Sequence, residues 1–404
     1  METGYTQNKW HLWGNKRVIL LMRKILLICI NLTLTLLAYS QVKISGTVVS
    51  ETDGKPLGFA NVFINNTMKG ATTAENGTFT IKDVAAGKYQ LIASYVGYET
   101  ISNDVEVIND NISIRITMKP KATVLKAFEV KRDPNREAYI KKFKETFIGK
   151  SVNSKLCKLM NDEILDIGYN KMDDALEATS DDYLIVENKA LGYRVRFLLK
   201  QYTNSEKHNF ISYYGYAFYE NLPTKKKAQK KLWMENREKA YHGSSLHFFR
   251  TLIQGDTQEE GFTMNEIIRK KRVSGYIKDS ATSEAKIMLS RDAYAEDDSY
   301  ANYRMPAQLK PSELISQSDS IPEKYILHFD HFLLVTYTKE EEEAGYAKTQ
   351  GRRPRYQESM IRFQKPYCIF SKEGLCEDPM AMIFSGYWGW EKIAELVPYD
   401  YKSN

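Results

Sequence analysis

The run of the 404-residue sequence best suited to chemistry is His328-Phe329-Asp330-His331. Two imidazoles and a carboxylate within four residues are ligand types that transition metals take. On a strand, however, side chains three positions apart point to opposite faces, so His328 and His331 would not chelate one ion without a bulge. The spacing therefore argues against a metal site here.

A second candidate lies around His247. Helical spacing would align His247 with Ser244 and with Arg250, which could form a polar pocket. The alternative is a core histidine that is hydrogen-bonded within the helix packing, and we favour it. Two aromatic clusters, Tyr213-Tyr214-Gly215-Tyr216 and Tyr387-Trp388-Gly389-Trp390, could stack on sugars, but such residues lie more often in a core.

Known catalytic motifs do not occur in the sequence. It has no His-Glu-x-x-His zinc motif, no Gly-x-Ser-x-Gly nucleophile motif and no phosphate-binding loop of the type Gly-x-x-x-x-Gly-Lys-Ser/Thr. No histidine has a glutamate three residues further on, as a metallocarboxypeptidase requires. We therefore assign no catalytic, cofactor-binding or metal-binding residue and expect no cofactor.

The N-terminus has the pattern of a secretory signal peptide, which we place at residues 1–40, with Met22 as the initiator. Met22-Arg23-Lys24 is a short basic region, residues 25–38 are mostly apolar, and Ala38 and Ser40 put small side chains before a cut at Gln41. The alternative is an uncleaved membrane anchor. The uncharged run 25–41 has only 17 residues, which barely spans a hydrocarbon core of ~30 Å, so we expect cleavage and export.

Charge and cysteine content say little about partners. The formal net charge is +6, but residues 1–40 carry +4 of it, so the exported chain has little overall charge to attract nucleic acid or an anionic membrane. Cleavage leaves three cysteines, Cys157, Cys368 and Cys376. The last two flank a turn, and a disulfide between them and a pair of reduced, half-buried thiols are both consistent with this spacing.

Residues 42–119 have the pattern of a β-sandwich. Short alternating segments such as 42–48 and 112–118 are separated by turn residues, among them Gly54 before Pro56 and the Asn76-Gly77 pair. About seven strands at this spacing are typical of a sandwich.

The same stretch resembles the carboxypeptidase-like regulatory domain, a transthyretin-like sandwich of envelope proteins in Gram-negative bacteria. The resemblance is carried by an ordered set of short motifs: Gly46-Thr47-Val48, Gly54-Lys55-Pro56-Leu57, Ala60-Asn61-Val62, Gly70-Ala71-Thr72-Thr73, Asn76-Gly77-Thr78-Phe79, Gly87-Lys88-Tyr89 and Ser94-Tyr95-Val96-Gly97-Tyr98. It implies a cell-envelope location and no catalytic residues in this domain.

A linker at 120–133 leads to a region, 134–404, for which we expect an α+β domain of mainly antiparallel strands. Its pattern predicts a helix over 135–148, then a five-stranded meander over 164–219, then basic and apolar helices over 223–252. The charged segment 339–355, between two later strands, is expected to be a solvated loop. Several runs, among them 187–193, 236–244 and 396–401, resemble larger envelope proteins that carry the same sandwich first and have no assigned activity.

The sequence predicts a non-catalytic binding or scaffold protein of the periplasm, outer membrane or cell surface. Its partner would be another envelope protein or a glycan, with no nucleic acid, no transmembrane span in the exported chain, and a peripheral contact with the outer membrane left open. The alternative is a hydrolase of unfamiliar type that acts on glycan or peptide through residues 134–404. A pocket with convergent carboxylates or histidines would favour the hydrolase. A receptor barrel is disfavoured because the sequence lacks the many alternating strands that a barrel needs.

Overall fold

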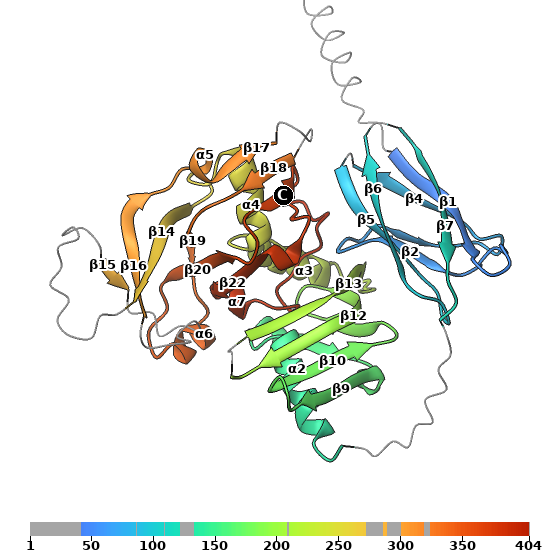
Figure 1. The fold of residues 1–404 in the computed structure, drawn as a ribbon, viewed down its shortest axis with the longest axis horizontal. Helices are drawn as coiled ribbons and strands as arrows, with labels where there is room; N and C mark the ends of the chain where they lie inside the picture. The colour runs from blue at the N-terminus through green and yellow to red at the C-terminus, as the bar shows by residue number, and fades with distance from the viewer. Residues whose placement is uncertain are drawn as a thin grey trace, which may run out of the picture.

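The computed structural model describes residues 42–121, 133–271, 286–288, 300–318 and 324–403, apart from residues 86, 109, 208 and 209. The expected signal peptide and most of the expected linker lie outside these residues, and both stay predictions. Within the described part of the chain, no helix is long and apolar enough to cross a membrane. Figure 1 shows three bodies packed together: a sandwich, a middle sheet and a C-terminal lobe.

The first body confirms the expected β-sandwich. One of its sheets has the order β4-β1-β7, with β1 antiparallel to β4 and parallel to β7, and the other has the order β3-β2-β5-β6. Alternation along β1 buries Ile44 and leaves Lys43 exposed, as expected for a strand with one side facing the core. The strands are β1 (Val42–Ser50), β2 (Asn61–Ile64), β3 (Gly70–Thr72), β4 (Thr78–Val84), β5 (Gly87–Ser94), β6 (Ile101–Val107) and β7 (Ile112–Met118).

The second body is a six-stranded antiparallel sheet, which we call the middle sheet. Its order is β8-β11-β12-β10-β9, and β13 pairs with the other side of β12. The five expected strands are present and antiparallel, and three of the four pairs of the expected meander form. The fourth does not: β12 is so long that β11 and β10 lie along successive halves of it and do not pair with each other. The elements are η1 (Asn153–Leu156), β8 (Cys157–Leu159), η2 (Asp162–Ile164), β9 (Leu165–Asn170), β10 (Ala175–Ser180), β11 (Leu184–Asn188), β12 (Tyr193–Ser205) and β13 (Phe210–Asn221).

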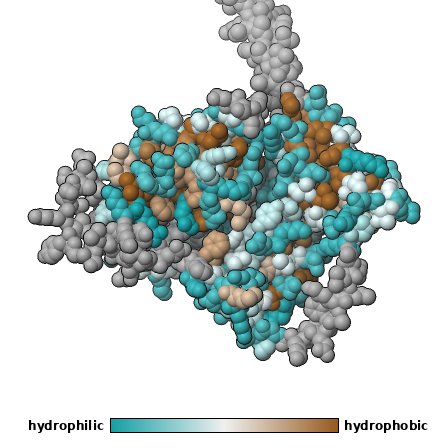
Figure 2. Space-filling model, viewed as in Figure 1, coloured by the Kyte–Doolittle hydropathy of each residue, from teal (hydrophilic) through white to brown (hydrophobic). Residues whose placement is uncertain are grey.

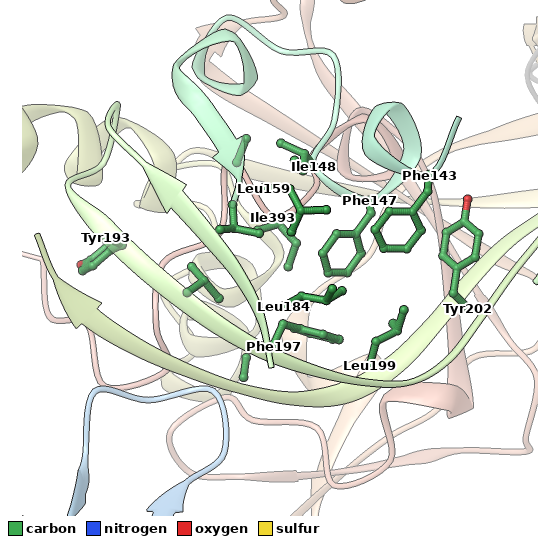
Figure 3. Close-up of a cluster of buried hydrophobic side chains, with 14 of the residues drawn as sticks. Phe143, Phe147, Ile148, Leu159, Leu184, Tyr193, Phe197, Leu199, Tyr202 and Ile393 are labelled. Carbon is green, nitrogen blue, oxygen red and sulfur yellow. The ribbon is translucent and has the colours of Figure 1, made fainter. Parts of the chain in front are cut away.

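Helix α2 (Arg136–Phe147) covers one face of the middle sheet and agrees with the expected helix. Its residues Phe143 and Phe147 are fully buried, with ring centres 4.9 Å apart. Figure 3 shows these two rings side by side above the strands, with Tyr202 beside Phe143. The opposite face of the middle sheet is therefore free to meet another body.

The C-terminal lobe holds a second six-stranded sheet, β15-β16-β14-β19-β20-β22, and a small sheet, β17-β18-β21. Helix α4 buries Phe248, Phe249 and Leu252 against this lobe. Its elements are α3 (Lys227–Tyr241), α4 (Ser245–Gln254), β14 (Phe262–Lys271), β15 (Lys286–Met288), β16 (Tyr300–Gln308), α5 (Pro311–Leu314), β17 (Ile315–Gln317), β18 (Lys324–Leu327), β19 (Phe332–Glu341), α6 (Ala344–Thr349), β20 (Tyr356–Phe363), β21 (Cys368–Ser371), η3 (Pro379–Ala381), β22 (Met382–Gly386) and α7 (Tyr387–Trp390).

The charged segment between β19 and β20 is largely exposed, as expected of a solvated loop, but it is folded around a buried ion pair. Its Glu342 side chain is fully buried and pairs with the guanidinium groups of Arg352 and Arg355. Tyr346 and Ala347 of α6 are also buried. The expectation fails at Glu342 because opposite charges ten residues apart neutralise each other when the segment folds back, so the burial of one carboxylate is compensated.

The cysteines take one of the two arrangements left open. Cys368 of β21 and Cys376 form a disulfide. Cys157 is a free thiol, half-buried, and burial raises its pKa to about 12.

Candidate functional site

His328, Asp330 and His331 lie in the connection between β18 and β19 and do not converge on one point. Nδ1 of His328 donates to the carbonyl of Pro366 (2.8 Å), and its Nε2 lies 3.4 Å from Asp330. Nε2 of His331 instead lies 3.8 Å from Glu266. The two imidazoles thus have separate partners.

His247 is the core histidine that we favoured. It is 3% exposed, its backbone N–H donates to the side chain of the N-cap residue Ser244, and its Nδ1 accepts the N–H of Gly243 (3.2 Å). Arg250 does not share a pocket with it. The Arg250 guanidinium donates instead to the carbonyls of Tyr399 and Tyr401, at 2.8 and 2.9 Å.

A cluster that the sequence analysis missed surrounds this histidine. One ligand atom from each of His242, His247 and Glu260 lies within 4.8 Å of the others. His242 directly follows α3, His247 is in α4, and Glu260 follows α4. No sequence signal links them, because the sharp turn at Gly243 (φ +81°) and the return of the chain towards β14 bring them together.

The hydrogen bonds of this cluster disfavour a metal ion. Because Nδ1 of His247 accepts a hydrogen bond, its ring proton sits on Nε2, which lies 3.4 Å from Glu260 and donates to it. A metal-bound histidine usually does the reverse and donates from its second nitrogen. The ammonium group of Lys339 lies 3.7 Å from the same carboxylate oxygen and would repel a cation.

The pKa of His247 fits this structural role. Burial, and secondarily the nearby His242, lowers its pKa to about 4, so the ring is neutral at neutral pH. Aromatic rings of Phe262 and Tyr337 pack against it, and the indole of Trp388 donates to the carbonyl of Gly243 (2.7 Å). The cluster therefore joins the α3–α4 turn to the C-terminal sheet.

Both aromatic clusters lie in packed regions. Tyr387 and Trp388 are 6% and 7% exposed and belong to the lobe. Tyr216, 8% exposed, packs in the contact between the middle sheet and the sandwich. These three side chains are covered, which agrees with the core interpretation.

The outer face of the sandwich packs against the free face of the middle sheet. Phe63 and Ile92 of the sandwich are buried together with Tyr183, Leu198 and Tyr216. The β2–β3 turn also bonds to β13: the N–H of residue 66 donates to the carbonyl of residue 217 (2.7 Å), and the N–H of residue 219 donates to the carbonyl of residue 67 (3.0 Å). Such contacts hold the two sheets in a fixed relation.

The C-terminal segment adds a third connection. The N–H of Tyr399 donates to the carbonyl of Asn66 (2.7 Å), and the N–H of Met68 donates to the carboxylate of Asp400 (3.0 Å). Arg250 of the lobe bonds the same segment. Accordingly, the C-terminus lies between the lobe and the sandwich (Figure 1).

An open groove remains beside the packed contact, with a cavity volume of about 290 Å³. We call it the interdomain groove. Its lining combines aromatic rings with polar side chains: Asn61, Phe63, Thr72, Tyr183, Arg196, Phe218 and Glu220. Nε of Arg196 donates to Glu220 (2.9 Å), and each side chain is about one third exposed. A Cβ on Gly70 would lie 2.9 Å from the ring of Phe218, so only glycine permits this approach.

A second cavity, beside Arg352 and Arg355, is much smaller. Its volume is about 20 Å³, which is room for one water molecule and not for a ligand. The arginines there pair with Glu342 and Glu358.

Figure 2 shows hydrophobic residues gathered over the sandwich and parts of the lobe, while hydrophilic residues cover much of the remaining face. The interdomain groove is therefore the candidate binding site.

A comparison with protein families identifies the sandwich. Residues 44–130 match the CarboxypepD_reg-like domain, which confirms the resemblance drawn from the turn and strand motifs. The N-terminal sandwich is thus a carboxypeptidase-regulatory-like domain. The match covers less than half of the chain and says nothing about residues beyond it.

Solved structures resemble the chain only distantly, and no curated protein matches it. A chain of a type II cohesin–X-dockerin complex from Acetivibrio cellulolyticus is 25% identical over 20% of this chain and 58% of that one, with a TM-score of 0.18. A candidate carbohydrate-binding protein from Bacteroides uniformis is 11% identical over 39% and 60%, also at 0.18. The major pilin subunit of Bacillus cereus is 6% identical over 86% and 85%, at 0.18.

Proposed function

We propose that this chain is an exported, non-catalytic binding protein of the cell envelope that holds a saccharide unit of an envelope glycan in the interdomain groove. The observation that carries the proposal is the groove itself. Hydrogen bonds and a shared apolar contact hold two sheet faces in place and leave a lined cavity beside them. A preformed, partly apolar cavity with a few polar groups is the usual form of a small-ligand site.

The size and lining of the groove favour a glycan over a protein partner. A stable protein interface buries roughly 800 Å² on each side, whereas a cavity of about 290 Å³ accommodates a small unit. The ring of Phe218 can pack on the C–H face of a sugar. Arg196, Glu220 and Asn61 supply donors and acceptors for sugar hydroxyl groups.

The alternative of a hydrolase is less well supported by this geometry. Glycoside hydrolysis uses two carboxyl groups that flank the scissile bond. Among the residues that line the groove, Glu220 is the one carboxylate, and it is paired with Arg196. The histidine with a strongly lowered pKa, His247, is buried in the lobe and does not line the groove.

Export and an envelope location are part of the proposal. The signal-peptide pattern supports them, and the Cys368–Cys376 disulfide fits an oxidising compartment. Fractionation of native cells with intact-mass analysis tests this part. A chain that starts at Gln41, in the periplasm or outer membrane, is expected; an uncleaved chain in the cytosol would contradict export.

Photo-crosslinking in native cells tests the groove. A benzophenone amino acid replaces Thr72, an exposed residue of the groove, and in a control replaces Met172, which is 93% exposed and lies elsewhere. We expect a glycosidase-sensitive adduct from position 72 and none from position 172. Equal adducts at both positions, or none at position 72, would rule out the groove as the binding site.

A further inference from the structure

Helix α3 is fixed to the middle sheet by one side only. Trp233, Asn236 and Arg237 donate to the carbonyls of residues 189, 190 and 191, which follow one another in the turn between β11 and β12, at 2.9, 2.8 and 2.7 Å. The Arg237 guanidinium also lies 3.8 Å from the ring centre of Tyr193. Three consecutive anchors hold the helix in one orientation, and residues 225–228, 230–232, 234 and 235 at its start are exposed.

The exposed start of the helix and the approach to it are strongly basic. Five lysines lie within seven residues: Lys225, Lys226, Lys227, Lys230 and Lys231. Lys231 has a loose pair with the exposed Glu235 at 3.7 Å, and no carboxylate of the described residues lies within ion-pair distance of the other four. We call these five lysines, with Leu232 and Met234, the α3 surface.

The segment that contains the α3 surface is more basic than the rest of the exported chain. Residues 221–241 hold six lysines and one arginine against two glutamates, a net charge of +5, whereas residues 41–404 together carry +2. The exported chain thus has a low net charge although this segment has a local excess of positive charge. Local density, and not the net charge of the molecule, sets the attraction to a charged surface within a Debye length.

Two apolar side chains are exposed beside these lysines. Leu232 is 48% exposed and Met234 is 50% exposed, in the same turn of the helix as Lys230 and Lys231. Phosphates of a nucleic acid would contact the amines but would give these apolar side chains nothing to bury against. The headgroup region of a lipid bilayer can bind both the lysine amines and the apolar side chains. The amines contact lipid phosphates, and the apolar side chains enter the boundary with the acyl chains.

We propose that the α3 surface docks the protein on an anionic lipid surface through lipid phosphates. The charge complementarity and the flanking apolar pair define this partner. The inference does not depend on the interdomain groove, which lies on the opposed faces of the sandwich and the middle sheet. Failure of either proposal leaves the other standing.

Vesicle sedimentation tests the proposal. The protein is residues 41–404, which contain every described residue and lack the apolar N-terminal run. The probes are vesicles of phosphatidylcholine and vesicles of equal parts phosphatidylcholine and phosphatidylglycerol. The charge variant is Lys226→Glu with Lys227→Glu and Lys230→Glu. Its matched control reverses three exposed lysines of the middle sheet and its connections, Lys155, Lys158 and Lys171.

We expect the protein to sediment with the anionic vesicles and not with phosphatidylcholine. Each lysine near an anionic surface contributes about fivefold in affinity, so removing three lysines should weaken binding about a hundredfold and reversing their charges should weaken it further, while the control variant binds like the wild type. Equal sedimentation with both vesicle types, or an equal loss in the control, would overturn the proposal.

A second variant separates a lipid surface from other polyanions. Leu232→Ser with Met234→Ser keeps every charge and removes the apolar side chains. Weaker vesicle binding at unchanged binding to double-stranded DNA is the expected result. If wild type and this variant bind vesicles equally well, and DNA binds as tightly as the vesicles, the surface is a general polyanion site and the lipid proposal is wrong.

Discussion

At the scale of single residues, His247 makes the stability of the protein depend on pH. Its pKa is lowered to about 4 by burial, against 6.5 for an ordinary histidine. Between these values the unfolded chain binds a proton that the folded chain does not, so stability falls as the pH falls from 6.5 to 4. The contribution is full above pH 6.5 and amounts to about 3 kcal/mol at most.

Urea midpoints measured across this range check the prediction. His247→Phe should flatten the pH dependence, since the titrating ring is gone. His328→Gln is the control, because His328 is largely exposed and should leave the dependence intact. An unchanged pH dependence in His247→Phe would show that other groups cause it.

Arg250 is the second residue with a specific structural task. Its guanidinium donates to the carbonyls of Glu373, Tyr399 and Tyr401, which joins the disulfide loop to the C-terminal segment. A lysine cannot reproduce this fork, so Arg250→Lys should lower the free energy of unfolding by about 2 kcal/mol. Arg353→Lys, at an exposed position, should change it little. Equal urea midpoints for both variants would contradict the assigned role.

At the scale of elements, the attachment of α3 depends on Gly192. Its φ is +71°, and a Cβ there would lie 2.1 Å from the Trp233 ring. Gly351 has a similar φ of +65° with nothing within 4 Å, which makes it a matched control. Gly351→Ala should lower the free energy of unfolding by about 1 kcal/mol, because of the backbone conformation alone. Gly192→Ala should lower it several times more and loosen the attachment of α3.

Hydrogen exchange of α3 amides and urea midpoints measure these effects. Equal losses of stability in the two variants would mean that the Trp233 contact does not contribute to the stability of the protein.

The elements also show how far a sequence can be interpreted. Local patterns predicted the sandwich, α2 and the five strands between residues 164 and 219, because alternation and helical periodicity are local properties. The pairing of β12 with both β10 and β11 depends on strand length in three dimensions, and the burial of Glu342 depends on arginines that return from beyond α6. The predictions failed at these two points: the pairing of β10 and the burial of Glu342.

The residues of the candidate sites show the same difference between local and long-range features. The sequence pointed to His247 and its local partner Ser244, which are three residues apart. It named neither Glu260 nor the groove, since Phe218, Arg196 and Thr72 meet only when the sandwich docks on the middle sheet. No periodicity marks a contact between two separately folded sheets.

At the scale of the whole molecule, the contact between sandwich and middle sheet is held by a small apolar cluster. Phe63, 2% exposed, lies 5.4 Å from Phe218 and 6.1 Å from Tyr183 between ring centres. Phe63→Asp would bury an unpaired charge there, which costs several kcal/mol, so the sandwich should detach. Small-angle scattering should then give a larger radius of gyration with strand content unchanged.

Phe59→Asp is the control for this experiment. Phe59 is 66% exposed on the same domain, and its φ of +65° suits an aspartate. This variant should stay compact. If Phe63→Asp is equally compact, the cluster does not hold the two bodies together.

The central claim is that the interdomain groove binds a saccharide without cleaving it. Calorimetric titration with saccharides released from the native envelope, followed by mass analysis of the sugars, tests it most directly. We predict saturable binding of an intact saccharide, weakened about tenfold or more by Phe218→Ala or Arg196→Ala, as for loss of a central contact, and unaffected by Tyr169→Ala at an exposed site. Equal binding by the groove variants, or recovery of shortened sugars, would contradict the account.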